Sequence, residues 1–181
     1  MPTQHFLEAA PIVDFAALDS LRPTLGRIVA TSGGFDPIHP GHASLLLQAR
    51  KLGDTLVAIV NGDAFLRRKK GKPFQDLRTR CQVVSFLRGV DFVLPFEIEA
   101  DMTVCEALRR LRPHVFANGG DRASPQDLPE WKVCQEHGIE LVFGVGASKQ
   151  WSSSNFLKEW TAYSLASAST QAGPGDVTGR R

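Results

Sequence analysis

The feature that most constrains the fold is an uninterrupted, mostly apolar run at residues 55–60 (TLVAIV). A strand without polar alternation is buried on both faces, as in parallel sheets that helices cover on both sides. Similar short runs lie at residues 26–31, 91–94, 114–117 and 139–143, and they alternate with helical patterns near residues 41–52, 77–88, 103–111, 129–137 and 153–164. This order predicts an α/β fold with a doubly wound, mostly parallel five-stranded sheet and helices on both faces.

Two terminal segments flank the predicted domain, which comprises residues 25–166. Residues 1–24 form an N-terminal extension with one short helix after Pro11. The inner face of that helix is predicted to consist of Val13, Ala16, Ala17 and Leu21. Residues 167–181 are small, polar and rich in glycine. They bury too little apolar surface to offset their ordering entropy, so we expect them to be disordered.

The composition excludes several functional classes. Lysine and arginine exceed aspartate and glutamate by only 21 − 19 = 2, whereas a nucleic-acid-binding protein usually has a larger basic excess. The three cysteines lie far apart without a CxxC pair, which argues against a zinc site and a disulfide framework. We see neither a leader segment nor an apolar run of membrane-spanning length, so we expect a cytoplasmic protein without membrane contacts.

The most informative segment for function is residues 32–42 (SGGFDPIHPGH), between the first predicted strand and the first predicted helix. In a Rossmann-like sheet, ligands bind beyond the carboxyl ends of the strands, where this turn lies. Gly33 and Gly34 allow the backbone to approach an anion, and the helix start adds outward-pointing N–H groups. His39 and His42 can face the same phosphate group, and Gly41 leaves room beside it.

These residue types suit phosphoryl chemistry at a nucleoside triphosphate. Attack on its α-phosphorus builds negative charge that positioned donors stabilise. No serine or cysteine with a matching base lies nearby, so we do not expect a covalent intermediate. A lone histidine at a helix start is usually a cap or a core residue, but a pair flanked by glycines is harder to explain in that way. A metal site is the other alternative, and no acidic or cysteine cluster accompanies the pair.

Residues 34–42 (GFDPIHPGH) resemble the GxFDxxHxGH signature of the cytidylyltransferase-like nucleotidyltransferases. The resemblance extends from about residue 27 to residue 157. Residues 49–54 (ARKLGD) and 60–63 (VNGD) are similar to segments of glycerol-3-phosphate cytidylyltransferases and ADP-heptose synthases. Residues 115–121 (VFANGGD) are similar to a segment of the heptose-phosphate adenylyltransferases, and residues 152–154 (SSS) to the family's phosphate-binding serine motif.

The resemblance implies a role for each matching residue. The implied catalytic residues are His39, His42 and Lys69. The implied nucleotide-binding residues are Gly33, Gly34, Phe35, Asp36, Gly41, Asp121, Lys149, Ser152, Ser153 and Ser154. The implied acceptor-binding residues are Asn61, Asp63, Lys72, Arg80 and Asn118. Alternatives remain for several of them: Arg80 as a structural ion pair, Asp121 as a turn residue, the serines as a helix cap, and the basic run at residues 67–72 as a solvated loop or lid.

The family resemblance implies transfer of CMP or AMP from CTP or ATP to a phosphorylated small molecule, with release of pyrophosphate. It also implies Mg²⁺ as a cofactor, held mainly by the triphosphate, and a homodimer. One alternative is an adenylyltransferase of cofactor synthesis that acts on a nicotinamide or pantetheine phosphate. Another is a non-catalytic nucleotide-binding sensor. Asn118 stands where the heptose-type enzymes have a lysine, and the arginine that usually accompanies the serine motif is absent.

Overall fold

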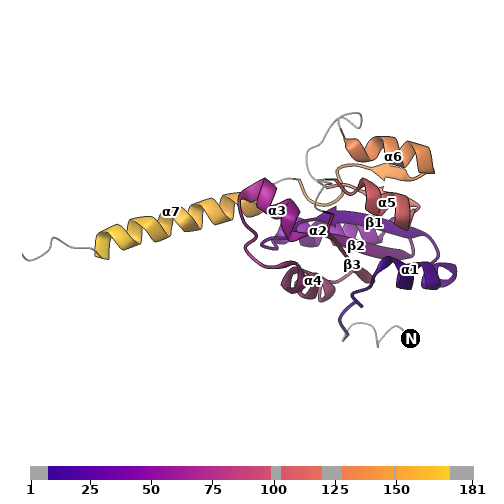
Figure 1. Ribbon diagram of the computed structural model, residues 1–181, viewed down its shortest axis with the longest axis horizontal. Helices are drawn as coiled ribbons and strands as arrows, with labels where there is room; N and C mark the ends of the chain where they lie inside the picture. The colour runs from indigo at the N-terminus through magenta and orange to yellow at the C-terminus, as the bar shows by residue number, and fades with distance from the viewer. Residues whose placement is uncertain (1–7, 99–102, 120–127, 149, 172–181) are drawn as a thin grey trace, which may run out of the picture.

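A parallel sheet forms the centre of the computed structural model, which describes residues 8–98, 103–119, 128–148 and 150–171 (Figure 1). Its strands are β1 (Ile28–Gly33), β2 (Thr55–Asn61), β3 (Phe92–Phe96), β4 (Val115–Ala117) and β5 (Glu140–Val142). They pair in the order β3-β2-β1-β4-β5, and every pairing is parallel. The predicted doubly wound five-stranded sheet is therefore confirmed.

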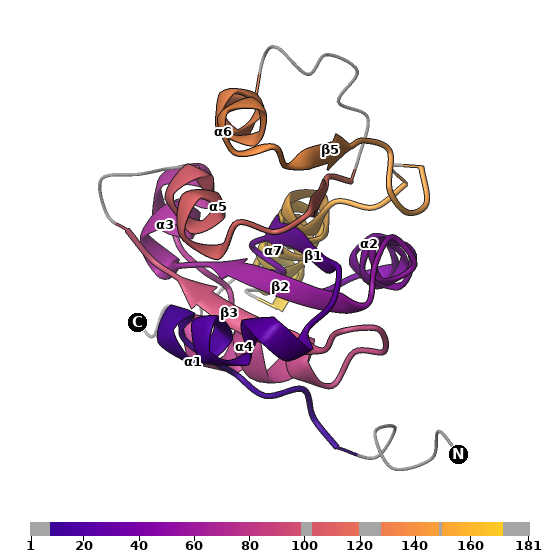
Figure 2. The same cartoon turned by 90° about the vertical axis from the view of Figure 1, so that its right-hand side faces the viewer.

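Helices cover both faces of this sheet (Figure 2). The α-helices of the described residues are α1 (Phe15–Leu21), α2 (Pro40–Arg50), α3 (Asp63–Lys70), α4 (Leu77–Ser85), α5 (Cys105–Leu111), α6 (Pro129–His137) and α7 (Ser153–Gln171), of which α7 extends away from the sheet. One core contains side chains of α1, α5 and α6, and the other contains side chains of α2 and α4. Successive residues of β2 alternate between the two cores, which is why this strand is apolar throughout.

The strand order reverses between β1 and β4. From β1 the chain proceeds outward to β2 and β3, and it then returns to the other side of β1 as β4 and β5. In open α/β sheets, ligands bind at the carboxyl ends of the strands that flank this switch point. The turn that joins β1 to α2 leaves the sheet there, so the fold brings the histidine-containing segment to the expected binding position.

Part of the N-terminal segment forms backbone hydrogen bonds with the edge of the sheet. The Val13 N–H donates to the Val93 carbonyl at 2.9 Å, and the Val93 N–H donates to the Pro11 carbonyl at 3.0 Å. Residues 10–13 thus cover the edge of β3, which would otherwise present unpaired backbone groups. The predicted inner face of the helix is wrong, because Leu18 is buried while Ala16 and Leu21 are exposed.

Two further segments differ from the prediction. The basic run assigned to a loop lies mostly in α3, which buries Leu66 and ends at Gly71, where φ is 89°. The last helix, α7, continues to Gln171, so the first residues of the predicted disordered tail are helical. Residues 172–181 lie outside the described part of the chain. Within that part, no helix combines the length and the apolar character that crossing a membrane requires.

Candidate active site

Two stacked imidazoles lie at the carboxyl end of β1. His39 is the N-cap of α2, and its Nδ1 accepts a hydrogen bond from the His42 backbone N–H at 3.3 Å. The two rings stack with 3.7 Å between their centroids and 16° between their planes. A neutral His39 ring that accepts at Nδ1 has its proton on Nε2, where it can be donated to a ligand. The predicted pair is thus brought together at the predicted turn.

Burial keeps His42 neutral. Its pKa is lowered from 6.5 to about 3, first by burial and then by the charges of His39, Lys70 and Lys69. Burial also lowers the pKa of His39. Within the described structure, His42 Nδ1 is buried without a hydrogen-bond partner. A buried polar atom without a hydrogen-bond partner is energetically unfavourable, so we expect Nδ1 of His42 to bind a ligand atom or a water molecule.

We expect His42 of the ligand-free protein to stay neutral from pH 8 to about pH 4, since its pKa lies near 3. The unfolded chain binds this proton near pH 6.5. Protonation of His42 in the unfolded chain therefore lowers the free energy of unfolding as the pH falls from 6.5 towards 3. Above that range His42 is neutral in both states and does not change the stability. NMR titration, with His42→Gln to assign the resonance, measures the midpoint. A midpoint near 6.5 in the native protein would contradict the buried geometry.

Buried side chains hold the turn between β1 and α2 in place. Phe35 has a left-handed backbone (φ 49°), and its ring packs edge-on against His42 with 5.1 Å between centroids. The two carboxylate oxygens of Asp36 accept hydrogen bonds from the Phe74 and Gln75 N–H groups, each at 2.8 Å. Because only 1% of Asp36 is exposed and both its carboxylate oxygens are paired, this residue fixes the turn from within.

Close side-chain packing favours glycine at two positions of this turn. A Cβ at Gly34 would lie 2.8 Å from the Leu66 side chain. A Cβ at Gly41 would lie 3.1 Å from the His39 ring and 3.5 Å from Trp151. The sequence predicted room for a phosphate at both positions. In the structure, the side chains of Leu66, His39 and Trp151 occupy the space beside these two glycines.

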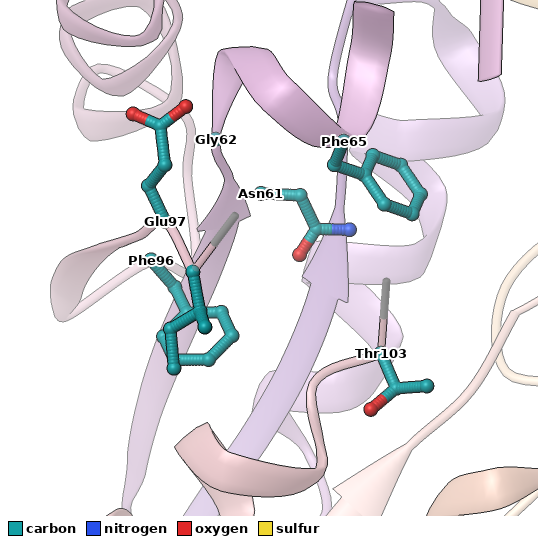
Figure 3. Close-up of a pocket in the computed structure, with 7 residues that line it drawn as sticks. Asn61, Gly62, Phe65, Phe96, Glu97 and Thr103 are labelled. Atoms are coloured by element: carbon teal, nitrogen blue, oxygen red, sulfur yellow. The ribbon is translucent and has the colours of Figure 1, made fainter. Parts of the chain in front are cut away.

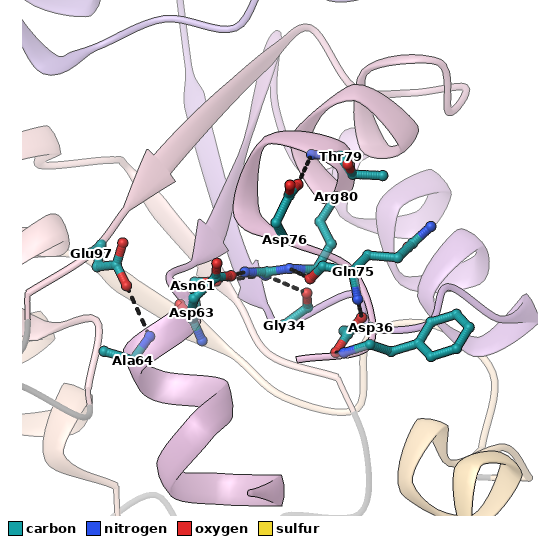
Figure 4. A network of polar contacts seen from close by, with 11 residues as sticks. Gly34, Asp36, Asn61, Asp63, Ala64, Gln75, Asp76, Thr79, Arg80 and Glu97 are labelled. Carbon is teal, nitrogen blue, oxygen red and sulfur yellow. Dashed lines mark hydrogen bonds and ion pairs between the residues drawn. The ribbon is translucent and has the colours of Figure 1, made fainter. Parts of the chain in front are cut away.

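Arg80 joins the ends of β1 and β2 from within the protein (Figure 4). Its Nη1 donates to the carbonyls of Gly34 at 2.8 Å and Asn61 at 2.6 Å, and its Nη2 donates to the Asp63 carboxylate at 2.6 Å. Its Nε donates to the Gln75 carbonyl at 3.0 Å. Arg80 has no exposed surface. Of the two roles considered for Arg80, the structure therefore shows the structural ion pair, which Arg80 forms with Asp63.

Lys70 is the lysine that reaches the histidine turn. Its Nζ donates to the Asp36 carbonyl, and its charge lowers the pKa of both His39 and His42. Partial burial lowers the pKa of Lys70 itself. The predicted catalytic lysine, Lys69, is exposed, and its Nζ lies 5.3 Å from the centroid of the Phe65 ring. Successive side chains of a helix point in different directions, which explains why Lys70 reaches the turn while the neighbouring Lys69 is exposed.

A small pocket lies at the carboxyl ends of β2 and β3, beside this turn (Figure 3). Its described lining contains Asn61, Phe65, Phe96, Glu97 and Thr103, and none of the described lining residues is basic. Asn61 is 8% exposed, and its Oδ1 is buried without a partner among the described residues. The Glu97 carboxylate instead accepts the Ala64 N–H at 2.8 Å. An unpaired acceptor between aromatic rings suits a neutral hydroxyl group better than a phosphate.

A larger pocket, of about 530 Å³, lies on the other side of α2, against the segment that follows β5. Its lining comprises Ser44 and Gln48 of α2, Lys51 and Leu52 after that helix, and residues 142–147. The Ser44 hydroxyl accepts the Ala147 N–H at 2.8 Å, which ties α2 to this segment. The volume is in the range of small-molecule pockets. The pocket therefore extends along α2 from Ser44, two residues after His42, to Leu52 beyond the end of the helix.

Comparisons with known proteins agree with this geometry. Residues 30–151 match the family model described as Cytidylyltransferase-like. The chain belongs to the cytidylyltransferase-like family. It is 43% identical over 144 residues to the Bifunctional protein HldE of Streptomyces coelicolor, and 42% identical over 118 residues to that of Azorhizobium caulinodans. These matches cover 77% and 64% of this chain, but only 30% and 24% of those relatives.

Two solved structures of similar fold extend this result. The lipopolysaccharide core biosynthesis protein from Thermoplasma volcanium has a TM-score of 0.56 and 27% identity, over 67% of this chain and 97% of that one. The pantoate-beta-alanine ligase from Francisella tularensis has a TM-score of 0.54 and 16% identity, over 80% of this chain and 69% of that one, and supports the fold alone. The predicted family is thus confirmed, and the similar relatives include HldE proteins.

The serine motif of this family member lies beside the histidine turn. Ser152 caps α7, with its Oγ 3.4 Å from the Asn155 N–H. The Ser153 hydroxyl donates to the Pro37 carbonyl at 2.9 Å, which fastens the start of α7 to the turn. Ser154 is half-buried in the first turn of α7. The predicted capping role is therefore present, and the same helix start also faces the site.

The remaining predicted residues are less closely tied to the histidine turn. Lys72 is exposed after α3. Asn118 lies at the end of β4, where its N–H donates to the Val142 carbonyl at 2.8 Å and its carbonyl accepts the Val145 N–H at 3.2 Å. Asp121 and Lys149 lie outside the described residues. Among the described residues, no group of His, Cys, Asp and Glu is arranged to hold a metal ion.

Proposed function

We propose that this chain transfers AMP from ATP to a sugar phosphate and releases pyrophosphate. The observation that carries the proposal is the stacked His39–His42 pair at the switch point of the sheet. The similarity to HldE proteins, together with the resemblance of residues 115–121 to the heptose-phosphate adenylyltransferases, favours ATP over CTP and a sugar phosphate over other acceptors. The whole activity, substrates and partners of the longer HldE relatives are not implied.

In this proposal, a phosphate oxygen of the acceptor attacks the α-phosphorus of ATP in line. The new P–O bond forms as the bond to the β-phosphate oxygen breaks, and pyrophosphate leaves with its electron pair. Negative charge on the transferring group is stabilised by donors that are already in place, namely His39, His42 and Lys70. In this proposal Mg²⁺ enters as part of the Mg–ATP substrate and is held mainly by the triphosphate, as the family resemblance implies.

The two pockets suggest where the substrates lie. The larger pocket beside the segment after β5 has the volume for the nucleoside. The small pocket at Asn61 would take hydroxyl groups of the acceptor, whose oxygen-rich body needs neutral hydrogen-bond partners. A homodimer, which the family resemblance implies, belongs to the same proposal.

A direct assay tests the proposed function. The protein is mixed with Mg²⁺, with ATP or CTP, and with a panel of sugar 1-phosphates and glycerol phosphate, and pyrophosphate release is measured. We expect release that requires ATP and a sugar phosphate together. Release with nicotinamide mononucleotide or pantetheine phosphate instead would support the cofactor-synthesis alternative. ATP binding without release for any acceptor would support a sensor.

Lys70 and Lys69 offer a matched pair of substitutions. We expect Lys70→Met to lower kcat/KM by about 10- to 100-fold, because its charge lies beside both histidines and a charge-assisted contact is lost. Lys69→Met, one residue away on the exposed face of α3, should change kcat/KM less than about threefold. Steady-state kinetics with ATP and the sugar phosphate compare the two. The opposite ranking would restore Lys69 as the catalytic lysine.

The Asn61 pocket makes a prediction about acceptor binding. We expect Asn61→Ala to raise the KM of the sugar phosphate by about 10-fold, with little change in the KM of ATP, because only a hydrogen bond to the acceptor is lost. Asn61→Asp keeps an acceptor oxygen at this position and serves as the comparison. An increase in the KM of ATP alone would assign this pocket to the nucleotide.

A further inference from the structure

The start of α3 is held by a residue that follows another strand. Gly62 is the N-cap of this helix, and it has no side chain that could accept a backbone N–H. The carboxylate of Glu97, directly after β3, accepts the Ala64 N–H at 2.8 Å instead (Figure 4). The first N–H groups of a helix lack partners within it. Glu97 therefore supplies from a distance the cap that the local sequence lacks.

The backbone at Gly62 is shaped to admit Glu97. A Cβ at Gly62 would lie 2.5 Å from the Glu97 Cβ, so the glutamate side chain lies directly against this glycine. The Gly62 N–H donates to the Phe96 carbonyl at 2.7 Å, which ties the start of the helix to the end of β3. A negative charge at this position also interacts favourably with the helix dipole. The glycine and the glutamate are thus complementary in both shape and hydrogen bonding.

Helix α3 depends on the contacts at its start because the helix itself is weak. It has eight residues, and Leu66 is its buried residue. Isolated helices of this length are marginal in water. Residues 67–70 are all basic, and like charges on one short helix repel each other. Besides Glu97, the Asp63–Arg80 ion pair holds the same end. The position of the whole helix is therefore set largely from its first turn.

The other end of α3 carries the lysine that reaches the histidine turn. Lys70 donates from its Nζ to the Asp36 carbonyl, which places its charge beside His39 and His42. The helix is roughly 12 Å long at 1.5 Å per residue. A small tilt at the capped end therefore moves the ammonium group of Lys70 relative to both imidazoles.

We propose that Glu97 is a positioning residue for AMP transfer, which holds Lys70 at the histidine turn by capping α3. This inference rests on the proposed function, in which Lys70 stabilises the transferring phosphate. Glu97 and Phe65 of α3 also line the Asn61 pocket (Figure 3). The helix that carries Lys70 is therefore also a wall of the proposed acceptor pocket, and Glu97 links the two places.

Kinetics at saturating ATP and sugar phosphate test the proposal. We expect Glu97→Ala to lower kcat by about 10-fold, because a small displacement of a positioned group slows turnover steeply. Glu97→Gln keeps an oxygen that can accept the Ala64 N–H, and its kcat should stay within about threefold of the wild type. Glu130→Ala is the matched control. The Glu130 carboxylate accepts the N–H of Val104, the N-cap of α5, at 3.4 Å, and α5 carries no proposed site residue, so kcat should not change.

A double-mutant cycle shows whether Glu97 acts through Lys70. In a Lys70→Met background, we expect Glu97→Ala to lower kcat by less than about twofold further, because the lysine that it positions is gone. Melting temperatures check that each variant is folded. A loss of about 10-fold in both backgrounds would show an effect that does not pass through Lys70 and would overturn the proposal. A raised KM for the sugar phosphate with an unchanged kcat would overturn it in favour of a direct acceptor contact.

NMR titration of His39 tests the same link without turnover. Burial, and then the charge of Lys70, lowers the pKa of His39. We therefore expect both Lys70→Met and Glu97→Ala to raise this pKa in the ligand-free protein, and Glu130→Ala to leave it unchanged. Since no substrate is present, the result separates the role of Glu97 from the identity of the reaction. A raised pKa in Lys70→Met, together with an unchanged pKa in a folded Glu97→Ala protein, would contradict the proposed role.

Discussion

Replacement of His42 with asparagine is expected to lower kcat by about 100- to 1,000-fold, the usual effect of removing one donor from a transition state. Asparagine retains a polar group but cannot reproduce the stacking of His42 on His39 at 3.7 Å, nor the position of the ring nitrogens. The KM of ATP should change far less than kcat, because the lost contact matters most when the α-phosphate carries additional charge. Initial rates of pyrophosphate release measure both constants.

His137→Asn is the matched control for this substitution. His137 is exposed at the end of α6, outside the histidine turn, and its replacement should leave kcat unchanged. The melting temperatures of both variants show whether either substitution unfolds the protein. Near-normal turnover in a folded His42→Asn protein would remove His42 from the reaction.

Replacement of Arg80 with methionine is expected to destabilise the protein by about 3–5 kcal/mol, the usual cost of removing one partner from a buried ion pair. The Asp63 carboxylate and the carbonyls of Gly34, Asn61 and Gln75 would each lose a hydrogen bond. Methionine is also unable to hold the ends of β1 and β2 together. Urea denaturation followed by circular dichroism gives the free energy of unfolding.

Arg78→Met provides the control on the same helix. Arg78 is exposed, two residues before Arg80, so its replacement should change the free energy of unfolding by less than about 0.5 kcal/mol. Equal stability losses in the two variants would show that the buried network is not what stabilises this part of the sheet. A folded, stable Arg80→Met protein with a raised KM for the acceptor would return Arg80 to the substrate-binding residues.

The sheet and the histidine turn were predictable from local patterns. A strand buried on both faces needs an apolar residue at almost every position, and residues 56–60 are all apolar. The helix at α6 was predicted with the same bounds, because a proline begins it and a glycine follows its end. The signature at residues 34–42 places both histidines correctly, since a strand-to-helix turn of this kind leaves little freedom in their positions.

Other features depend on contacts between distant segments and were missed. The burial of Arg80 could not be read from its sequence position, because charged residues are usually exposed and its partners lie up to 46 residues away. Which of Lys69 and Lys70 lies at the histidine turn depends on α3, a helix that was not predicted because its basic run is typical of a solvated loop. The pairing of residues 10–13 with β3 joins segments about 80 residues apart. Local propensity carries no information on such long-range contacts.

The most direct test of the central claim is a crystal structure with Mg²⁺ and an ATP analogue that resists cleavage between its α- and β-phosphates. The α-phosphate is expected within hydrogen-bond distance of the His39 and His42 rings, with the base in the pocket beside residues 142–147. A nucleotide bound elsewhere, with both imidazoles remote from its phosphates, would contradict the proposed site and the reaction assigned to it.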